Sequence, residues 1–160
     1  MSAETNRERI VVGMDHRSES RVALGWAAAE AHRRGADLVV VHASDTLSPA
    51  PYAPVSRRAE AERRRLSERA ALDRAIAVVE DEYPDLSVRR YTSLESPVKD
   101  LLRHTEAADL LVLGSSAPGG AEAHLGPLLL ACLRHARCPV VVVNGGTTAP
   151  PRRTLSAARG

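Results

Sequence analysis

The chain has 160 residues and a mass of 17.2 kDa, the size of one ordinary domain. Hydrophobic residues make up 44% and charged residues 26%, a balance typical of a globular protein rather than a disordered one. The 22 basic and 20 acidic residues leave a net charge of +2, and aromatic residues are only 2%, so we expect no nucleic-acid partner: neither a basic field for phosphates nor a series of stacking rings is present.

Residues 1–8 are polar and are predicted to form a flexible N-terminus. They do not resemble a secretory signal, and no apolar run reaches the roughly 18 residues of a membrane span, so we expect a cytoplasmic protein without a membrane partner. Cys132 and Cys138 have no His or Cys partner at zinc-ligand spacing. Two reduced thiols and no metal site are therefore expected.

The chain then alternates between short apolar runs and helical patterns. Residues 10–14 form the first apolar run, a helical pattern extends from residue 18 or 20 to residue 34, Gly35 marks its end, and residues 38–41 form a second apolar run. Both runs are continuous rather than alternating. Continuous runs indicate strands that are covered on both faces, as in a parallel sheet.

A proline-rich segment at residues 47–56 is predicted to be a loop, because Pro49, Pro51 and Pro54 exclude a helix or a central strand. Residues 57–83 are predicted to form one long helix. We interpret its arginine-rich first half as a solvated face, with a polyanion site as the alternative. The residues expected on its inner face are Leu66, Ala70, Ile76, Val79 and Tyr83.

The second half of the chain continues the alternation. Residues 86–91 alternate in part and are predicted to be an edge strand with one face in water. Ser96 followed by Pro97 is a strong signal for the start of a helix. The remaining predicted elements are a buried strand at 110–114, a helix at 126–137, a last strand at 140–143 and a flexible tail at 145–160.

Five strands with four helices between them predict an α/β fold, an open parallel sheet with helices on both faces. Ligands of such sheets bind outside the carboxyl ends of the strands, at the point where the order of connection reverses. Two loops are therefore marked as candidate binding segments. One follows the first strand, from Asp15 to Ser18, and the other follows the fourth strand, from Gly114 to Gly126.

The residues of these two loops indicate which ligand groups each loop could bind. The second contains small residues and leads into a helix N-terminus, which suits a phosphate group, although a structural turn explains the same residues. It lacks the Gly-Lys-Ser/Thr of a Walker A loop, and its serines belong to no recognisable nucleophile motif, so no catalytic residue is assigned. Asp15 has the chemistry to accept hydrogen bonds from a ribose or a base, or to cap the helix that begins nearby.

The sequence resembles the universal stress protein family over Arg9 to Asn144. The resemblance rests on VVGMD at residues 11–15, ADLVVVH at 36–42, ADLLVLGS at 108–115 and LRHARCPVVVV at 133–143, of which the last is the most specific. It implies a Rossmann-like domain at residues 9–144 with sheet order 3-2-1-4-5. It also implies a homodimer through the last strand, formed by Val140, Val141, Val142 and Val143.

One branch of this family binds ATP, and the resemblance implies where an adenine nucleotide would lie. Asp15 and Val41 would hold the adenosine, and the glycines of the fourth-strand loop would wrap the phosphates. The candidate nucleotide-binding residues are Asp15, Val41, Gly114, Ser115, Gly119, Gly120 and Gly126.

The loop departs from the ATP motif of the family in three places. Ala117 replaces a glycine, the spacer from Pro118 to Leu125 is one residue short, and Pro127 replaces a Ser or Thr. Proline supplies neither the hydroxyl nor the backbone N–H that a phosphate needs. We therefore favour a non-catalytic stress-response domain in which ATP binding is weakened or lost. The alternatives are an ATP-binding, nucleotide-gated switch and a nucleotide-hydrolysing enzyme on the same fold.

Overall fold

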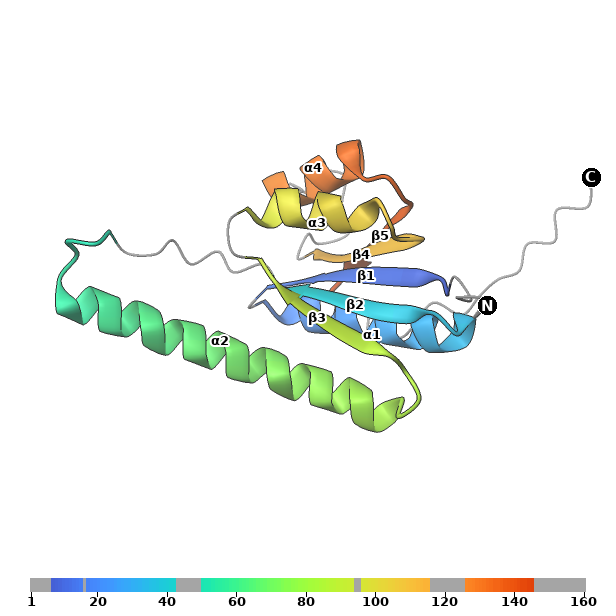
Figure 1. Ribbon diagram of the computed structural model, residues 1–160, viewed down its shortest axis with the longest axis horizontal. Helices are drawn as coiled ribbons and strands as arrows, with labels where there is room; N and C mark the ends of the chain where they lie inside the picture. The colour runs from blue at the N-terminus through green and yellow to red at the C-terminus, as the bar shows by residue number, and fades with distance from the viewer. Residues whose placement is uncertain (1–6, 16, 43–49, 94–95, 116–125, 146–160) are drawn as a thin grey trace, which may run out of the picture.

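The computed structural model describes residues 7–15, 17–42, 50–93, 96–115 and 126–145. Strands and helices alternate along the chain (Figure 1). The elements are β1 (Arg9–Met14), α1 (Ser18–Arg34), β2 (Asp37–His42), α2 (Val55–Glu82), β3 (Val88–Thr92), α3 (Pro97–Thr105), β4 (Leu110–Ser115), α4 (Pro127–His135) and β5 (Val140–Asn144).

The five strands form one parallel sheet in the order β3-β2-β1-β4-β5, which confirms the order that the family resemblance implies. α1 and α2 lie on one side of the sheet and α3 and α4 on the other (Figure 1). The core is divided in the same way: Val12 contributes to the cluster beneath α1, and Val11 contributes to the cluster beneath α3 and α4. Helices on both faces are thereby confirmed.

Burial on both faces explains the continuous apolar runs. Ile10, Val11 and Val12 in β1 have no exposed surface, and neither do Leu38 and Val41 in β2. The two helix signals are confirmed as well. Gly35 ends α1 in the left-handed conformation at φ 65°, and the Ser96 hydroxyl accepts a hydrogen bond from the backbone N–H of Lys99 at 3.5 Å.

The prediction for the long helix was wrong at its start. α2 begins at Val55, inside the segment predicted to be a loop, because Pro54 lies just before the first helical residue, where its missing N–H costs no hydrogen bond. The expected inner position of Leu66 is also wrong, since its side chain is 59% exposed. Only the second half of α2 packs on the body, through Ile76 and Val79, and the first half projects beyond the sheet (Figure 1).

Other element boundaries differ by one or two residues from the prediction. The edge strand β3 runs over Val88–Thr92 instead of 86–91, and four of its five residues are exposed. α4 ends at His135, before the predicted residue 137, because Ala136 adopts an extended backbone with ψ 142°. The predicted domain limits at 9–144 remain a prediction, and nearly all of both predicted flexible ends lies outside the described residues. Among the described helices, none is long and apolar enough to cross a membrane.

Glu30 organises the charged surface near the C-terminal end of α1. Its carboxylate accepts hydrogen bonds from the guanidinium groups of Arg33, at 2.6 and 3.0 Å, and Arg34, at 2.7 Å. The hydrogen bond from Arg33 is the main reason that the pKa of Glu30 falls from 4.5 to about 2. A carboxyl group whose pKa is lower in the folded state stabilises the fold above its unfolded pKa.

We expect Glu30→Gln to lower the free energy of unfolding by about 1 kcal/mol at pH 7, since the arginine partners are partly exposed. The difference from wild type should shrink as the pH falls from 4.5 to about 2, where Glu30 becomes protonated in the folded state. Urea denaturation at several pH values measures both effects. Glu106→Gln, at an exposed position after α3, is the control. A pH-independent difference would contradict this assignment.

Candidate functional site

The carboxyl ends of three adjacent strands lie along one edge of the sheet. The parallel register pairs Gly13 with Val41 and Met14 with His42, and β4 lies on the other side of β1. β1 is followed in the chain by β2 on one side, whereas β4 on its other side is reached only after β3, so the order of connection reverses between β1 and β4. Ligands of open α/β sheets bind at this point.

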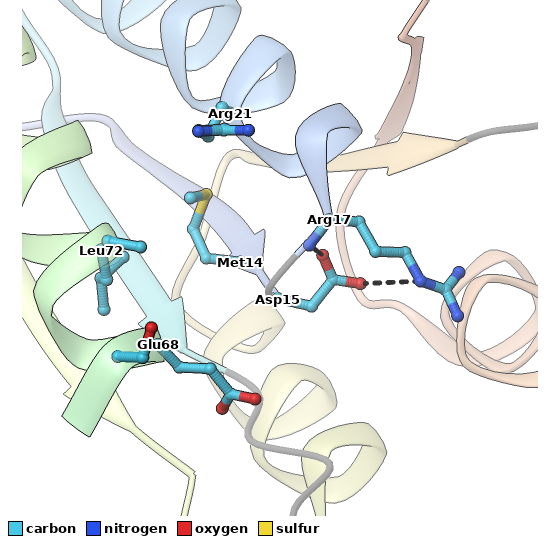
Figure 2. A pocket seen from close by; sticks show the side chains of 8 residues that line it. Met14, Asp15, Arg17, Arg21, Glu68 and Leu72 are labelled. Carbon is cyan, nitrogen blue, oxygen red and sulfur yellow. Dashed lines mark hydrogen bonds and ion pairs between the residues drawn. The ribbon is translucent and has the colours of Figure 1, made fainter. Parts of the chain in front are cut away.

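Asp15 follows β1 at this edge, and its carboxylate is already engaged within the chain. One carboxylate oxygen accepts hydrogen bonds from the backbone N–H of Arg17 at 2.9 Å and from the hydroxyl of Ser20 at 2.5 Å. The other lies 3.8 Å from the Arg17 guanidinium, and Figure 2 shows the carboxylate turned toward Arg17. The contacts fit the capping alternative, because Arg17 is the N-cap residue of α1 and makes no side-chain cap of its own.

A pocket of about 170 Å³ lies beside Asp15, between the C-terminal end of β1, the first turn of α1 and the middle of α2. Figure 2 shows Met14 between Arg21 on one side and Leu72 and Glu68 of α2 on the other. The lining residues are Met14, Asp15, Arg17, Arg21, Ser67, Glu68, Ala71 and Leu72. Charged groups of both signs therefore border a small apolar floor.

Val41 lines a different pocket. It is fully buried in β2 and forms part of the wall of a hollow of about 250 Å³ between the end of β3 and α3. Asp15 and Val41, which the family resemblance assigns to one adenosine, thus border two separate hollows.

Gly114 has a packing reason for lacking a side chain. A Cβ at this position would lie 2.6 Å from the carbonyl oxygen of Glu19 and 3.0 Å from the backbone nitrogen of Ser20. Only glycine therefore allows the first turn of α1 to approach β4 so closely. Ser115 follows, is 8% exposed, and accepts a hydrogen bond from the Gly145 N–H at its carbonyl.

Gly126 is the N-cap residue of α4, and Pro127 is the first residue of the helix. Gly126 has φ −60°, a conformation that other residues adopt readily, so its backbone does not require glycine. Pro127 removes one of the N–H groups that a helix N-terminus offers to an anion. The predicted residues Gly119 and Gly120 lie outside the described part of the chain.

The polar residues of the second pocket were not singled out in the sequence. Ser93 follows β3, and Asp100, Arg103 and His104 come from α3. A signal existed, because positions 100, 103 and 104 have the spacing of one helix face. Within the described residues, no three His, Cys, Asp or Glu side chains gather in a way that suits a metal ion.

Comparison with known proteins places these observations in a family. A model of the universal stress protein family matches residues 6–144. The chain is 34% identical over 140 residues to a universal stress protein of Mycobacterium tuberculosis, an alignment that covers 83% of this chain and 43% of the relative. The chain thus spans less than half the length of the first curated relatives that it matches.

Solved structures show the same fold. A universal stress protein from Lactobacillus plantarum is 18% identical, with a TM-score of 0.64 and coverage of 86% of this chain and 97% of that one. One from Archaeoglobus fulgidus, in complex with dAMP, is 22% identical, with a TM-score of 0.56 and coverage of 85% and 97%.

The packing role of Gly114 is tested by adding one methyl group. We expect Gly114→Ala to destabilise the protein by about 1–3 kcal/mol, because the new Cβ would overlap the backbone of Glu19. Gly25→Ala is the matched control: this exposed glycine inside α1 has no atom within 4 Å of its added Cβ. The control should stabilise the helix by about 0.5–1 kcal/mol. Equal effects of the two variants in urea denaturation would refute the packing role.

Proposed function

Because this chain belongs to the universal stress protein family, we propose that it is a non-catalytic stress-response protein whose affinity for adenine nucleotides is weakened or lost. The observation that carries the proposal is the N-terminus of α4, where Pro127 is the first helical residue. In a phosphate site of this type, the helix N-terminus binds the anion through its N–H groups. Pro127 offers neither an N–H nor a hydroxyl group to the anion.

The state of Asp15 supports the same proposal. A ribose or a base that used this carboxylate would compete with the Arg17 N–H and the Ser20 hydroxyl. Those two hydrogen bonds hold the start of α1, so their loss would cost stability.

The alternative function is a nucleotide-gated switch. The Archaeoglobus fulgidus relative solved with dAMP favours it, because that protein shares the fold of this chain. Under this alternative Asp15, Val41, Gly114, Ser115 and Gly126, together with Gly119 and Gly120, hold the nucleotide. The two functions differ in one measurable property, the affinity for ATP.

We expect the purified protein to carry no stoichiometric adenine nucleotide and to bind ATP with a Kd above about 1 mM. Pro127→Ser supplies a hydroxyl and an N–H, and should raise the affinity about tenfold, as one hydrogen bond to a charged group does. Pro139→Ser, before β5, is the control. Calorimetry of the three proteins and nucleotide analysis after heat denaturation measure these effects. Micromolar ATP binding by wild type would favour the switch instead.

The assembly proposed is a two-fold homodimer through β5 (Val140, Val141, Val142 and Val143). β5 is an outer strand of the sheet, so one side of its backbone has no strand partner within the described residues. An apolar edge of this kind invites pairing with another chain. Val140, Val141 and Val142 are only partly buried, which leaves side-chain surface for a second copy to cover.

We expect a dimer at tens of micromolar concentration in analytical ultracentrifugation, a rough scale for a specific interface. Val142→Lys should shift the protein to monomer, because a charged side chain on an edge strand opposes pairing. Val88→Lys places the same charge in β3, the opposite edge strand, and should leave the dimer intact. Circular dichroism checks that both variants fold. A dimer that survives Val142→Lys but not Val88→Lys would assign the interface to the other edge.

A further inference from the structure

The pocket between β3 and α3 has features that the nucleotide proposal does not use. It has a volume of about 250 Å³, larger than the hollow beside Asp15. Polar side chains from both elements surround it, and Val41 completes the wall. These polar residues are Tyr91, Thr92, Ser93, Asp100, Arg103 and His104.

Asp100 is held firmly in this pocket. The Ser93 hydroxyl donates to one of its carboxylate oxygens at 2.5 Å, and the Arg103 guanidinium donates to the other at 2.5 Å. Ser93 is itself anchored, since it is 8% exposed and its N–H donates to the His42 carbonyl at 2.8 Å. A carboxylate has about four acceptor positions and a guanidinium has five N–H donors, so both groups retain capacity for a ligand.

An aromatic wall lies beside this ion pair. The rings of Tyr91 and His104 are 4.7 Å apart at an interplanar angle of 51°. Burial, followed by the neighbouring Arg103, lowers the pKa of His104 below its ordinary 6.5. The imidazole is therefore uncharged at neutral pH. Tyr91 is 45% exposed, so part of its ring faces solvent and is accessible to a ligand.

The charges of the pocket cancel. Asp100 carries one negative charge, Arg103 carries one positive charge, and His104 is neutral at pH 7. A charged ligand would be attracted by one member of the ion pair and repelled by the other, whereas a neutral ligand with adjacent hydroxyl groups meets no such repulsion. A hydroxyl both donates and accepts, so it satisfies a carboxylate and a guanidinium that lie side by side.

We propose that the pocket between β3 and α3 binds a neutral vicinal diol, presented by a ring the size of one monosaccharide. The hydroxyl groups contact the remaining acceptor positions of Asp100 and the remaining N–H groups of Arg103, and the less polar ring face lies against Tyr91. A free sugar, a cyclic polyol and the ribose of a nucleoside share this chemistry. The site is independent of the proposed loss of phosphate binding at α4, because none of its residues belongs to that helix.

The test is an NMR titration of the labelled protein with glucose, ribose and myo-inositol. We expect saturable amide shifts confined to Tyr91–Ser93 and Asp100–His104, with a Kd in the millimolar range typical of small neutral ligands, roughly 1–10 mM. No saturable shift with any of the three compounds up to about 100 mM would overturn the proposal. Saturable shifts confined to other residues would overturn it as well.

Two variants test the assigned contacts. Tyr91→Ala and Asp100→Ala should each weaken the binding at least about tenfold, the factor for one hydrogen bond or ring contact. Asp100→Ala also removes the contact with Ser93 and could unfold the protein for that reason. If it does, the binding measured with Tyr91→Ala decides the test. Arg89→Ala, in the same strand but paired with Asp37 instead, is the matched control and should bind as wild type does. Unchanged affinity in Tyr91→Ala would refute the site.

Adenosine and 2′-deoxyadenosine separate the sources of the diol. Both contain the base, but only adenosine has two adjacent ribose hydroxyls, so the proposal requires adenosine to bind more tightly. Equal binding of the two would mean that the pocket recognises the base, and the diol proposal would be wrong. Neither outcome alters the expected weak binding of ATP phosphates at α4. The diol proposal and the proposal of weakened nucleotide binding can therefore be refuted independently of each other.

Discussion

The approach of the first turn of α1 to β4 determines the shape of the carboxyl edge of the sheet. Gly114 leaves room for the Glu19 carbonyl at a distance that no Cβ tolerates. Asp15 holds the same turn through the Ser20 hydroxyl and the Arg17 N–H. The first turn of α1 therefore cannot move relative to β4 without breaking these contacts.

This constraint changes how the family motif is interpreted in this chain. The family resemblance assigns Gly114 and Asp15 to a nucleotide site, yet both have a structural role that needs no ligand. Selection for packing alone would retain both residues in a protein that binds no phosphate. Pro127, by contrast, begins α4 and leaves its position without the N–H group that other residues would offer at a helix N-terminus.

The sequence predicted the structure best where the pattern of a short segment is set by burial alone. The continuous run from Leu38 to Val41 predicted a buried parallel strand, because burial on both faces leaves no other pattern. The start of α2 and the exposure of Leu66 were missed, since both depend on how far the helix extends beyond the sheet, which no local pattern encodes. The second pocket was missed for a related reason: it joins Ser93 to Asp100 across two elements, and their contact exists only in the folded chain.

The projecting half of α2 gives this helix an uneven stability along its length. α2 has 28 residues, but its buried residues, Ile76 and Val79, both lie near its C-terminal end. Arg90 adds anchors to that half through ion pairs with Asp73 and Glu80. Within the described residues, the first turns bury no side chain, so their helicity depends largely on the intrinsic propensity of alanine, arginine and glutamate, which is marginal in water. Backbone amides should therefore exchange with solvent fastest near Val55 and progressively more slowly toward Val79. The N-terminal half of this continuous helix can then unfold locally while the C-terminal half stays packed on the sheet.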